Sequence, residues 1–311
     1  MAGEAASVIT RRQFVKSLGL ATVGTAGFGG YALAEPWGTG VTRYRVSPPN
    51  WPKGLSLKLA LIADVHACDP FMSVERIRGI VEQTHSLEPD AVLLLGDYVA
   101  SHSLGRYATP VKHADWARAL GHLKAPLGVH AVLGNHDWWD DLAVQKRGSG
   151  CPRAGLALQD AGIILHDNTA MRLAKDGFGV WLAGLGDQQA LWRTRVQQLR
   201  DGVKYIGVDD LAGTLSQVHD DAPIVLMAHE PDIFASVPDR VALTVAGHTH
   251  GGQIRVLGYA PVVPSRFGNR YVYGHIVEDG RNLIVSGGLG CSGIPVRFGS
   301  PPEIVIVELS A

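Results

Sequence analysis

The chain has 311 residues, of which 46% are hydrophobic, and its 28 basic and 29 acidic side chains almost cancel. This length suits one large domain or two small ones, and the charge balance argues against the basic footprint of a nucleic-acid-binding protein. The three cysteines, Cys68, Cys151 and Cys291, are too few and too scattered for a disulfide framework or a thiolate zinc site.

The first 34 residues have the pattern of an export signal. Arg11 and Arg12 lie within TRRQFVK and precede a mildly apolar run, which ends in Ala-Leu-Ala directly before Glu35. The arrangement resembles a twin-arginine signal with a cleavage site after Ala34. We expect residues 1–34 to direct the folded protein through the twin-arginine export machinery to the periplasm or cell envelope. Two alternatives stay open, a retained membrane anchor and an ordinary amphipathic helix, and the glycines of the run weaken both.

Residues 35–55 are rich in Pro, Gly and Trp, and we interpret them as a linker or an edge segment. Strands and helices are then predicted to alternate along the first half of the chain. The hydrophobic spacing predicts strands over 55–64, 89–97 and 128–137, and helices over 73–87 and 114–125. Because strand–helix–strand alternation is typical of parallel pairing, we expect a parallel sheet with helices on one face.

The second half of the chain is richer in strands. The pattern predicts hairpin-linked strands over 162–187, a short helix over 209–218, strands over 222–230 and 241–250, a hairpin over 270–290 that turns at Asp279-Gly280, and a last strand over 303–309. No repeat or low-complexity run divides these elements. A single mixed α/β domain over residues 56–311 is the simplest interpretation.

The predicted strand ends carry a narrow set of residue types. These are Asp64 and His66, Asp97, Asn135 with His136 and Asp137, His229, and finally His248 and His250. A polar turn is the ordinary interpretation of a single His-Thr-His. However, ligands of open α/β sheets bind beyond the carboxyl ends of strands, so five such ends favour one shared site. Carboxylate, amide oxygen and imidazole together suit Zn, Mn or Fe, and the number of donors suits two ions better than one.

The ordered set D-x-H, G-D, G-N-H-D, a lone H and G-H-x-H resembles the calcineurin-like metallophosphoesterases, over nearly all of residues 57–311. The resemblance implies a four-layer αββα sandwich of two mixed sheets flanked by helices, with two divalent or trivalent ions of Mn, Fe or Zn. It implies a first metal held by Asp64, His66 and His250, a second held by Asn135, His229 and His248, a bridging Asp97, and a catalytic His136. Asp137 either orients His136 or caps the following turn.

Two stretches narrow the expected substrate. Ala100 stands where protein phosphatases of this superfamily have a second aspartate, which argues against a protein phosphatase. The C-terminal stretch GLGCSGIPVRFGSPPEIVIVEL resembles the YaeI/YkuE-type phosphodiesterases. Arg297 within it is a candidate phosphate contact, with a structural ion pair as the alternative. His102 is a candidate for reaching the substrate, with a surface position as the alternative.

We therefore expect a phosphoesterase, most simply a phosphodiesterase, that hydrolyses its substrate in line with a hydroxide placed between two ions. Its substrate would be a small-molecule or lipid-linked phosphoester and no nucleic acid. One alternative is a hydrolase of a UDP-2,3-diacylglucosamine-type pyrophosphate bond in lipid A metabolism at the membrane. Another is a non-catalytic metal-binding envelope protein, and the intact His136 argues against it.

Overall fold

The computed structural model describes residues 30–49, 51–100 and 104–311. Most of the expected signal peptide and also His102 lie outside these residues. Within the described chain, no helix combines the length and the apolar character that crossing a bilayer requires.

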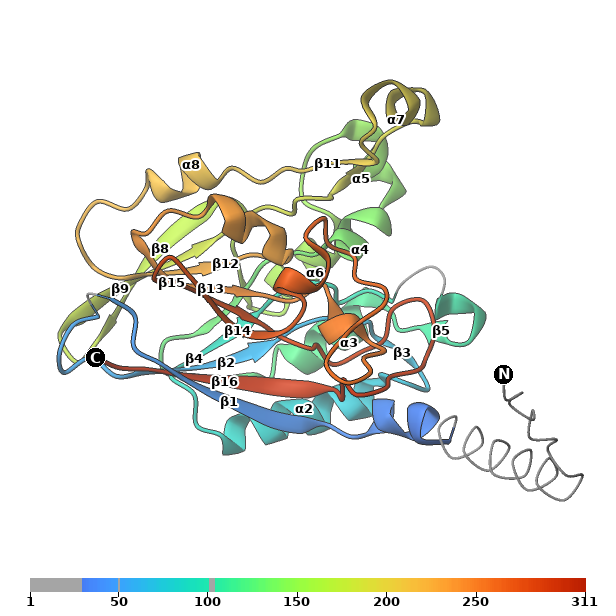
Figure 1. The fold of residues 1–311 in the computed structure, drawn as a ribbon. Helices are drawn as coiled ribbons and strands as arrows, with labels where there is room; N and C mark the ends of the chain where they lie inside the picture. Colours follow the sequence, from blue (N-terminus) through green and yellow to red (C-terminus); the bar gives the residue numbers. More distant parts are fainter. Residues whose placement is uncertain (1–29, 50, 101–103) are drawn as a thin grey trace, which may run out of the picture.

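The first sheet has six strands in the order β1-β16-β2-β4-β6-β7. Strands β2, β4, β6 and β7 are parallel, whereas β16 is antiparallel to β2 and parallel to β1. Figure 1 shows β1 and β16 side by side. The bounds of these strands are β1 (Gly40–Val46), β2 (Leu57–Ile62), β4 (Ala91–Leu94), β6 (Val129–Ala131), β7 (Ile164–Leu165) and β16 (Glu303–Leu309).

The second sheet also has six strands, in the order β14-β15-β13-β12-β9-β8. Its four inner strands are parallel, and the two edge strands are antiparallel to their neighbours. The predicted turn at Asp279-Gly280 joins β14 to β15, and both residues have positive φ, as a two-residue hairpin loop requires. The bounds are β8 (Thr169–Lys175), β9 (Phe178–Gly184), β12 (Ile224–Met227), β13 (Val241–Ala246), β14 (Gly274–Glu278) and β15 (Arg281–Val285).

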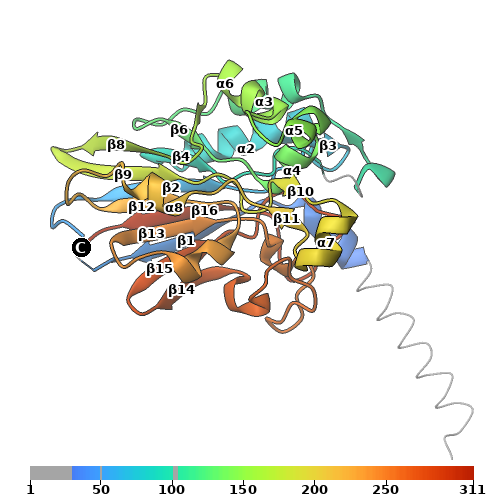
Figure 2. The same ribbon diagram turned by 90° about the horizontal axis from the view of Figure 1, so that it is seen from above.

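The two sheets pack face to face and helices cover their outer faces, which confirms the expected four layers. Strand β2 shows why: Leu59 and Leu61 pack between the sheets, and Ala60 and Ile62 point to the helical side, because successive side chains alternate. Helices α2 (Val74–Ser86), α3 (His113–Leu120) and α6 (Arg153–Asp160) gather on one side of the molecule (Figure 2). On the second sheet lie α8 (Leu211–Leu215), η3 (Pro231–Ser236) and η5 (Gly268–Tyr271).

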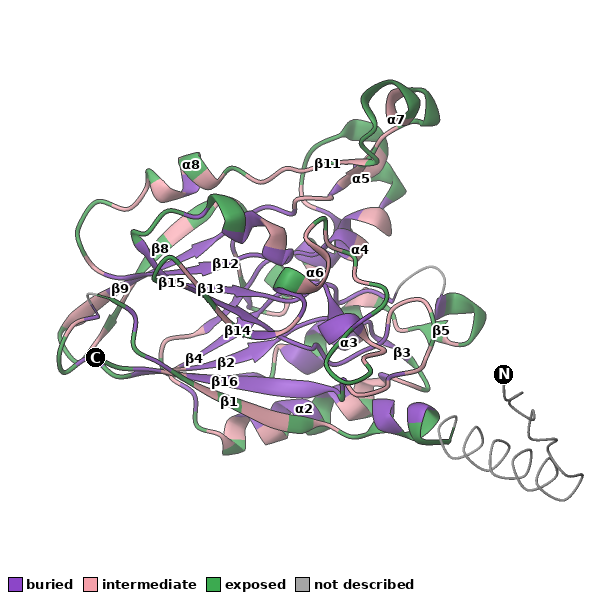
Figure 3. Cartoon of the chain, in the orientation of Figure 1, coloured by how far each residue is buried: buried purple, intermediate pink, exposed green. Residues whose placement is uncertain are grey.

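Two segments differ from the sequence interpretation, and a third agrees with one of its two alternatives. The expected strand over 128–137 ends at Ala131, and Asn135 begins a helix, α4 (Asn135–Trp139). The segment over 35–55 begins with a 3-10 turn, η1 (Glu35–Trp37), and supplies the edge strand β1, in agreement with the edge-segment alternative. An arm made of β10 (Leu191–Trp192), α7 (Arg195–Asp201) and β11 (Tyr205–Ile206) was not expected. Helix α7 buries none of its residues, in contrast to the buried strands (Figure 3).

The remaining elements are short. They are β3 (Cys68–Asp69), η2 (Leu104–Arg106), β5 (Thr109–Pro110), α5 (Leu142–Arg147) and η4 (His250–Gly252). The three cysteines are free thiols.

Candidate metal centre

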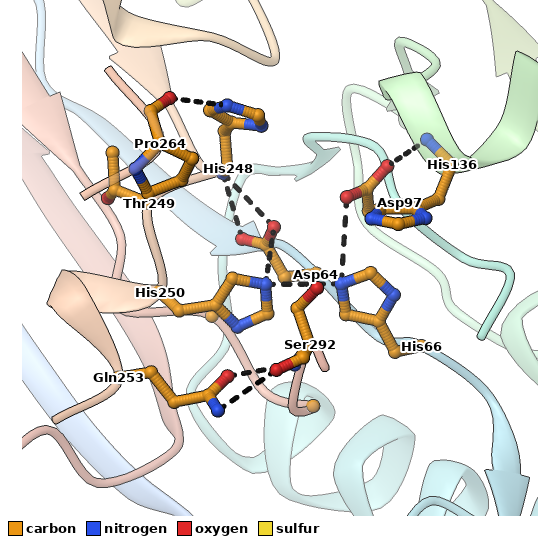
Figure 4. A network of polar contacts seen from close by, with 12 residues as sticks. Asp64, His66, Asp97, His136, His248, Thr249, His250, Gln253, Pro264 and Ser292 are labelled. Carbon is orange, nitrogen blue, oxygen red and sulfur yellow. Dashed lines mark hydrogen bonds and ion pairs between the residues drawn. The ribbon is translucent and has the colours of Figure 1, made fainter. Parts of the chain in front are cut away.

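The structure brings all seven expected metal ligands together where strand ends of both sheets meet. Figure 4 shows the central part of this cluster. Asp64, Asp97 and Asn135 follow β2, β4 and β6 of the first sheet, and His229 and His248 follow β12 and β13 of the second. Every one of the seven side chains is buried, with at most 7% of its surface exposed. Buried polar side chains of this kind must be paired with one another or with an ion.

The first metal group consists of Asp64, His66 and His250, whose potential ligand atoms all lie within 4.8 Å of one another. The Nε2 atoms of His66 and His250 are 3.1 Å apart, and His250 Nε2 is 3.5 Å from Asp64 Oδ1. His66 Nδ1 donates to Val99 O at 2.8 Å, which leaves its Nε2 free to bind an ion. These three side chains can therefore hold one metal ion.

The second metal group consists of Asn135, His229 and His248. His248 Nδ1 is 3.0 Å from Asn135 Oδ1 and 3.2 Å from His229 Nε2. The outer nitrogens donate to backbone carbonyls, His248 Nε2 to Pro264 O at 2.8 Å and His229 Nδ1 to Leu95 O at 2.7 Å. Such hydrogen bonds fix the ring tautomer that a metal-binding imidazole needs.

Asp97 lies between the two groups. Its Oδ2 is 3.5 Å from His66 Nε2 of the first group and 3.3 Å from His229 Nε2 of the second. Its Oδ1 accepts a hydrogen bond from the backbone N–H of His136 at 2.9 Å. One carboxylate therefore faces both groups, which is the arrangement that a bridging ligand requires.

Asp97 and His229 form a charged pair within the chain itself. Burial disfavours a charged His229, but the Asp97 carboxylate outweighs burial and raises the pKa of His229 well above its usual value. In spite of its own burial, the pKa of Asp97 is held well below its usual range, chiefly by His229. A proton here neutralises a buried carboxylate, and a metal ion can take its place because the surrounding donors are oxygen and nitrogen atoms. The residues present therefore fit a metal.

The ligands stand on strained backbone. Five of them have positive φ, a conformation that costs an ordinary residue about 1 kcal/mol or more: Asp64 (53°), His66 (46°), Asp97 (59°), His248 (70°) and His250 (54°). Strain of this kind persists only where the surrounding structure enforces it. The packed strands on either side therefore hold these loops in shape.

Glycines next to the ligands allow close approach of the backbone. A Cβ on Gly96 would lie 2.6 Å from the backbone nitrogen of Gly134 and 2.7 Å from His229 Nδ1. A Cβ on Gly247 would lie 2.7 Å from Asp64 Oδ2. Gly96 also has φ +94°, so it provides both a bend and a close approach.

His136 stands beside the two metal groups at the start of α4. Its ring lies 5.1 Å from the His66 ring and 5.0 Å from the Trp139 ring, measured between centroids. Its buried Nδ1 has no hydrogen-bond partner among the described residues. Burial lowers the pKa of His136 to about 3, so the imidazole is neutral at pH 7 in the metal-free chain.

Asp137 caps the turn, the second of its two expected roles. Its carboxylate accepts from the backbone N–H groups of Gly134, Asp97 and Tyr98 at 2.9 Å each, and of Val99 at 3.2 Å. The side chain therefore holds the loop that carries Asp97, and it does not orient the His136 ring.

The sequence profile of the calcineurin-like phosphoesterases matches residues 57–252 of the chain. The chain belongs to this family. It is a metallophosphoesterase, a hydrolase of phosphate esters, with residue groups that could hold metal ions.

Three bacterial relatives match this metallophosphoesterase over most of their own length. The uncharacterized metallophosphoesterase YkuE of Bacillus subtilis is 28% identical, over 97% of this chain and 98% of its own. The phosphodiesterase YaeI of Escherichia coli is 26% identical, over 97% of this chain and all of its own length. An uncharacterized metallophosphoesterase of Aquifex aeolicus is 28% identical, over 90% of this chain and 95% of its own.

The metal groups of the metallophosphoesterase lie in a cleft of about 1150 Å³, which Asp97, Asn135, His248 and His250 help to line. One wall is aromatic: Trp139 stacks on Tyr205 of the arm at 4.9 Å, and both line the cleft. Lys204 adds a cation on the same wall. The lining also includes the apolar residues Ile254, Pro261, Val262, Pro264 and Ile294. The cleft is much larger than a phosphoryl group, so it has room for large substituents on a phosphate.

Arg297 lies beneath the centre of the metallophosphoesterase and not in its cleft. The side chain has no exposed surface. Its guanidinium donates to the carbonyl oxygens of Gly290 and Ser300, and its Nη2 is 3.2 Å from His250 Nδ1. The prediction that Arg297 contacts the phosphate is therefore wrong, because these protein groups bind the guanidinium and bury it away from a ligand. The structural alternative is also different from an ion pair, since the main partners are carbonyl oxygens.

Two further buried acids of the metallophosphoesterase escaped the sequence analysis. Asp187 and Glu230 are each 1% exposed, and together with His229 they form a third group of potential metal ligands. Burial and the neighbouring Glu230 raise the pKa of Asp187 well above its usual value. Glu230 directly follows His229 in the sequence, but no local pattern marks Asp187.

Proposed function

We propose that this metallophosphoesterase is a phosphodiesterase with two metal ions, one in each metal group and both bound by Asp97. The observation that carries the proposal is the position of Asp97 Oδ2, 3.5 Å from His66 Nε2 and 3.3 Å from His229 Nε2. When bound, two such ions supply the charge that neutralises phosphoryl oxygens and lowers the pKa of water. The side chains named above fix where that charge lies.

His136 acts on the substrate in this proposal. It lines the cleft beside both groups, and its Nδ1 has no other partner in the described structure. Burial keeps the imidazole neutral in the metal-free chain, and an anionic phosphoryl group would favour its protonated form. As imidazolium, His136 would stabilise the transition-state charge or donate a proton to the leaving oxygen.

A diester is favoured over a phosphoprotein by two features of the cleft. Ala100 places no carboxylate near the centre, in contrast to the phosphoprotein phosphatase pattern. The cleft at the metal groups measures about 1150 Å³ and is lined by aromatic and apolar side chains, which leaves room for a second ester substituent. The same walls support a second candidate, a hydrolase of a UDP-2,3-diacylglucosamine-type pyrophosphate bond, because acyl chains would find apolar contacts there.

Hydrolysis of bis-p-nitrophenyl phosphate by manganese-loaded protein tests the proposal. We expect turnover that disappears with chelator and exceeds turnover of the monoester p-nitrophenyl phosphate. An enzyme that prefers the monoester contradicts the diester assignment. A protein that binds manganese and hydrolyses neither compound, nor a UDP-linked pyrophosphate, supports the non-catalytic alternative.

We also propose export by the twin-arginine route to the periplasm or envelope, supported by the paired arginines and the cleavage pattern before Glu35. N-terminal sequencing of the exported protein tests this proposal. A chain that begins at Glu35 supports cleavage. An intact N-terminus on membrane-bound protein supports the anchor.

A further inference from the structure

An N-terminal strap, residues 31–37, lies against the loop formed by residues 297–300. The Glu35 carboxylate accepts hydrogen bonds from the backbone N–H groups of Gly299 at 3.0 Å and Ser300 at 2.9 Å. The backbone N–H of Arg297 donates to the carbonyl of Ala32 at 3.2 Å. These bonds join the first described residues of the chain to a loop more than 260 residues away.

The same loop supports His250 of the first metal group. Ser300 Oγ donates to the carbonyl oxygen of His250 at 2.8 Å. Arg297 Nη1 donates to Ser300 O at 2.8 Å, and Arg297 Nη2 lies 3.2 Å from His250 Nδ1. A continuous set of contacts therefore runs from Glu35 through the loop to both the backbone and the ring of His250.

The Glu35 carboxylate of the strap holds the backbone of the loop that supports His250. Glu35 is only 8% exposed, and a buried carboxylate is costly unless hydrogen bonds satisfy it. Its two donors are the N–H groups of Gly299 and Ser300, so the carboxylate fixes the orientation of two consecutive peptide units. The second unit leads into Ser300, which contacts His250 directly.

We propose that Glu35 is a positioning residue for the first metal group. Its carboxylate fixes the 297–300 loop, and this loop fixes His250. The inference rests on the proposed two-metal function and assigns the strap a part in it. Cleavage after Ala34 would remove residues 31–34 of the strap, and with them the Ala32–Arg297 hydrogen bond, but would leave Glu35 as the first residue of the exported chain.

Manganese binding by the full chain tests this inference, with stoichiometry from metal analysis and affinity from titration calorimetry. Loss of an outer partner of a metal ligand weakens metal binding by about 10-fold to 100-fold. For Glu35→Ala we expect about a tenfold loss at one site and no change at the other. Glu35→Gln keeps one acceptor oxygen, so its manganese affinity at the affected site should lie between those of the wild type and Glu35→Ala.

Asp220→Ala is the matched control. The Asp220 carboxylate accepts N–H groups from Trp181 Nε1 at 2.7 Å, Arg172 Nε at 2.8 Å and Ala222 N at 3.0 Å, but it lies just before β12, at the opposite end of that strand from the metal groups. This variant should lower the unfolding temperature without changing either manganese affinity. Equal loss of affinity in the Glu35 and Asp220 variants overturns the inference, because it would indicate general destabilisation.

Ser300→Ala gives a second test that is independent of the strap's own folding. It keeps the backbone N–H that Glu35 binds but removes the hydroxyl that donates to His250. Weakened binding at one site supports the inference. If both Ser300→Ala and Glu35→Ala bind manganese at both sites as tightly as the wild type does, the inference is overturned. The two-metal proposal is unaffected by that result. Wild-type protein that binds none of manganese, iron and zinc instead refutes the proposed function itself.

Discussion

The two metal groups are supported in different ways. In the second group, His229 and His248 donate to carbonyls of Leu95 and Pro264, and Leu95 directly follows β4. In the first group, His250 lies on the short turn η4 and depends on the 297–300 loop and, through it, on Glu35. The comparison suggests a firm second group next to the sheet core and a first group that depends on distant parts of the chain. Four predictions test this difference.

The largest effect is expected at Asp97, which serves both groups. Asp97→Asn keeps the shape of the side chain but removes the shared charge. We expect diesterase activity to fall roughly a thousandfold, because stabilisation of several kcal/mol is lost. Bound manganese should fall at both sites. Full activity in this variant, measured under saturating manganese, would exclude a bridging role.

Removing one histidine from each group should give unequal results. His250→Ala should release one manganese ion and lower activity by about a hundredfold, since the second group keeps its ligands. His229→Ala should release both, because the second group loses one of its three ligands and the shared Asp97 then no longer faces a bound ion on that side. Metal analysis after dialysis measures the difference. The opposite ranking would show that the first group is the firmer one.

Asp137 tests how far the second group depends on the loop after β4. Asp137→Ala leaves four backbone N–H groups without their acceptor, two of them on Asp97 and Gly134. One buried unsatisfied donor costs about 1–3 kcal/mol, so we expect unfolding to become easier by about 3 kcal/mol or more. Urea unfolding with chelator present checks this value. Unchanged stability would mean that solvent replaces the carboxylate.

The smallest effect concerns a histidine pair outside the centre. His130 Nδ1 and His166 Nε2 are 3.1 Å apart, and burial, followed by His130, lowers the pKa of His166 to about 4. The unfolded chain takes up this proton near pH 6.5 and the folded chain only near pH 4. Stability should therefore decrease as the pH falls through this window, by at most about 1.4 kcal/mol per pH unit.

His166→Gln removes this contribution and flattens the pH profile of unfolding. The flattening should be the same with and without manganese, because His130 lies within β6 and His166 follows β7, and neither belongs to the metal groups. A metal-dependent change would place the pair in the centre and weaken the comparison.

The sequence predicted most of the fold because its patterns are local. The stretch LSLKLALIAD alternates apolar and polar residues before an apolar close, and this pattern predicted β2. The family resemblance then predicted which strand ends would meet, and the structure brings Asp64, Asp97 and the histidines together.

What the sequence did not predict depends on long-range contacts. The burial of Arg297 follows from carbonyls supplied by Gly290 and Ser300, which no spacing rule specifies. The arm with α7 was missed because its helix has no apolar face in contact with a core. The positive φ of the ligands was also hidden, since aspartate and histidine rarely adopt it without enforcement by neighbouring structure.

Each metal group takes ligands from both layers of the sandwich. In the first group, Asp64 and His66 follow β2 of the first sheet, and His250 follows β13 of the second. In the second group, Asn135 follows β6 of the first sheet, and His229 follows β12 of the second. Bound ions would therefore cross-link two sheets that otherwise meet through an apolar interface. Such cross-links join the two sheets at one end only. In the metal-loaded protein the sheets should therefore separate first at the other end, where β2 and β12 begin.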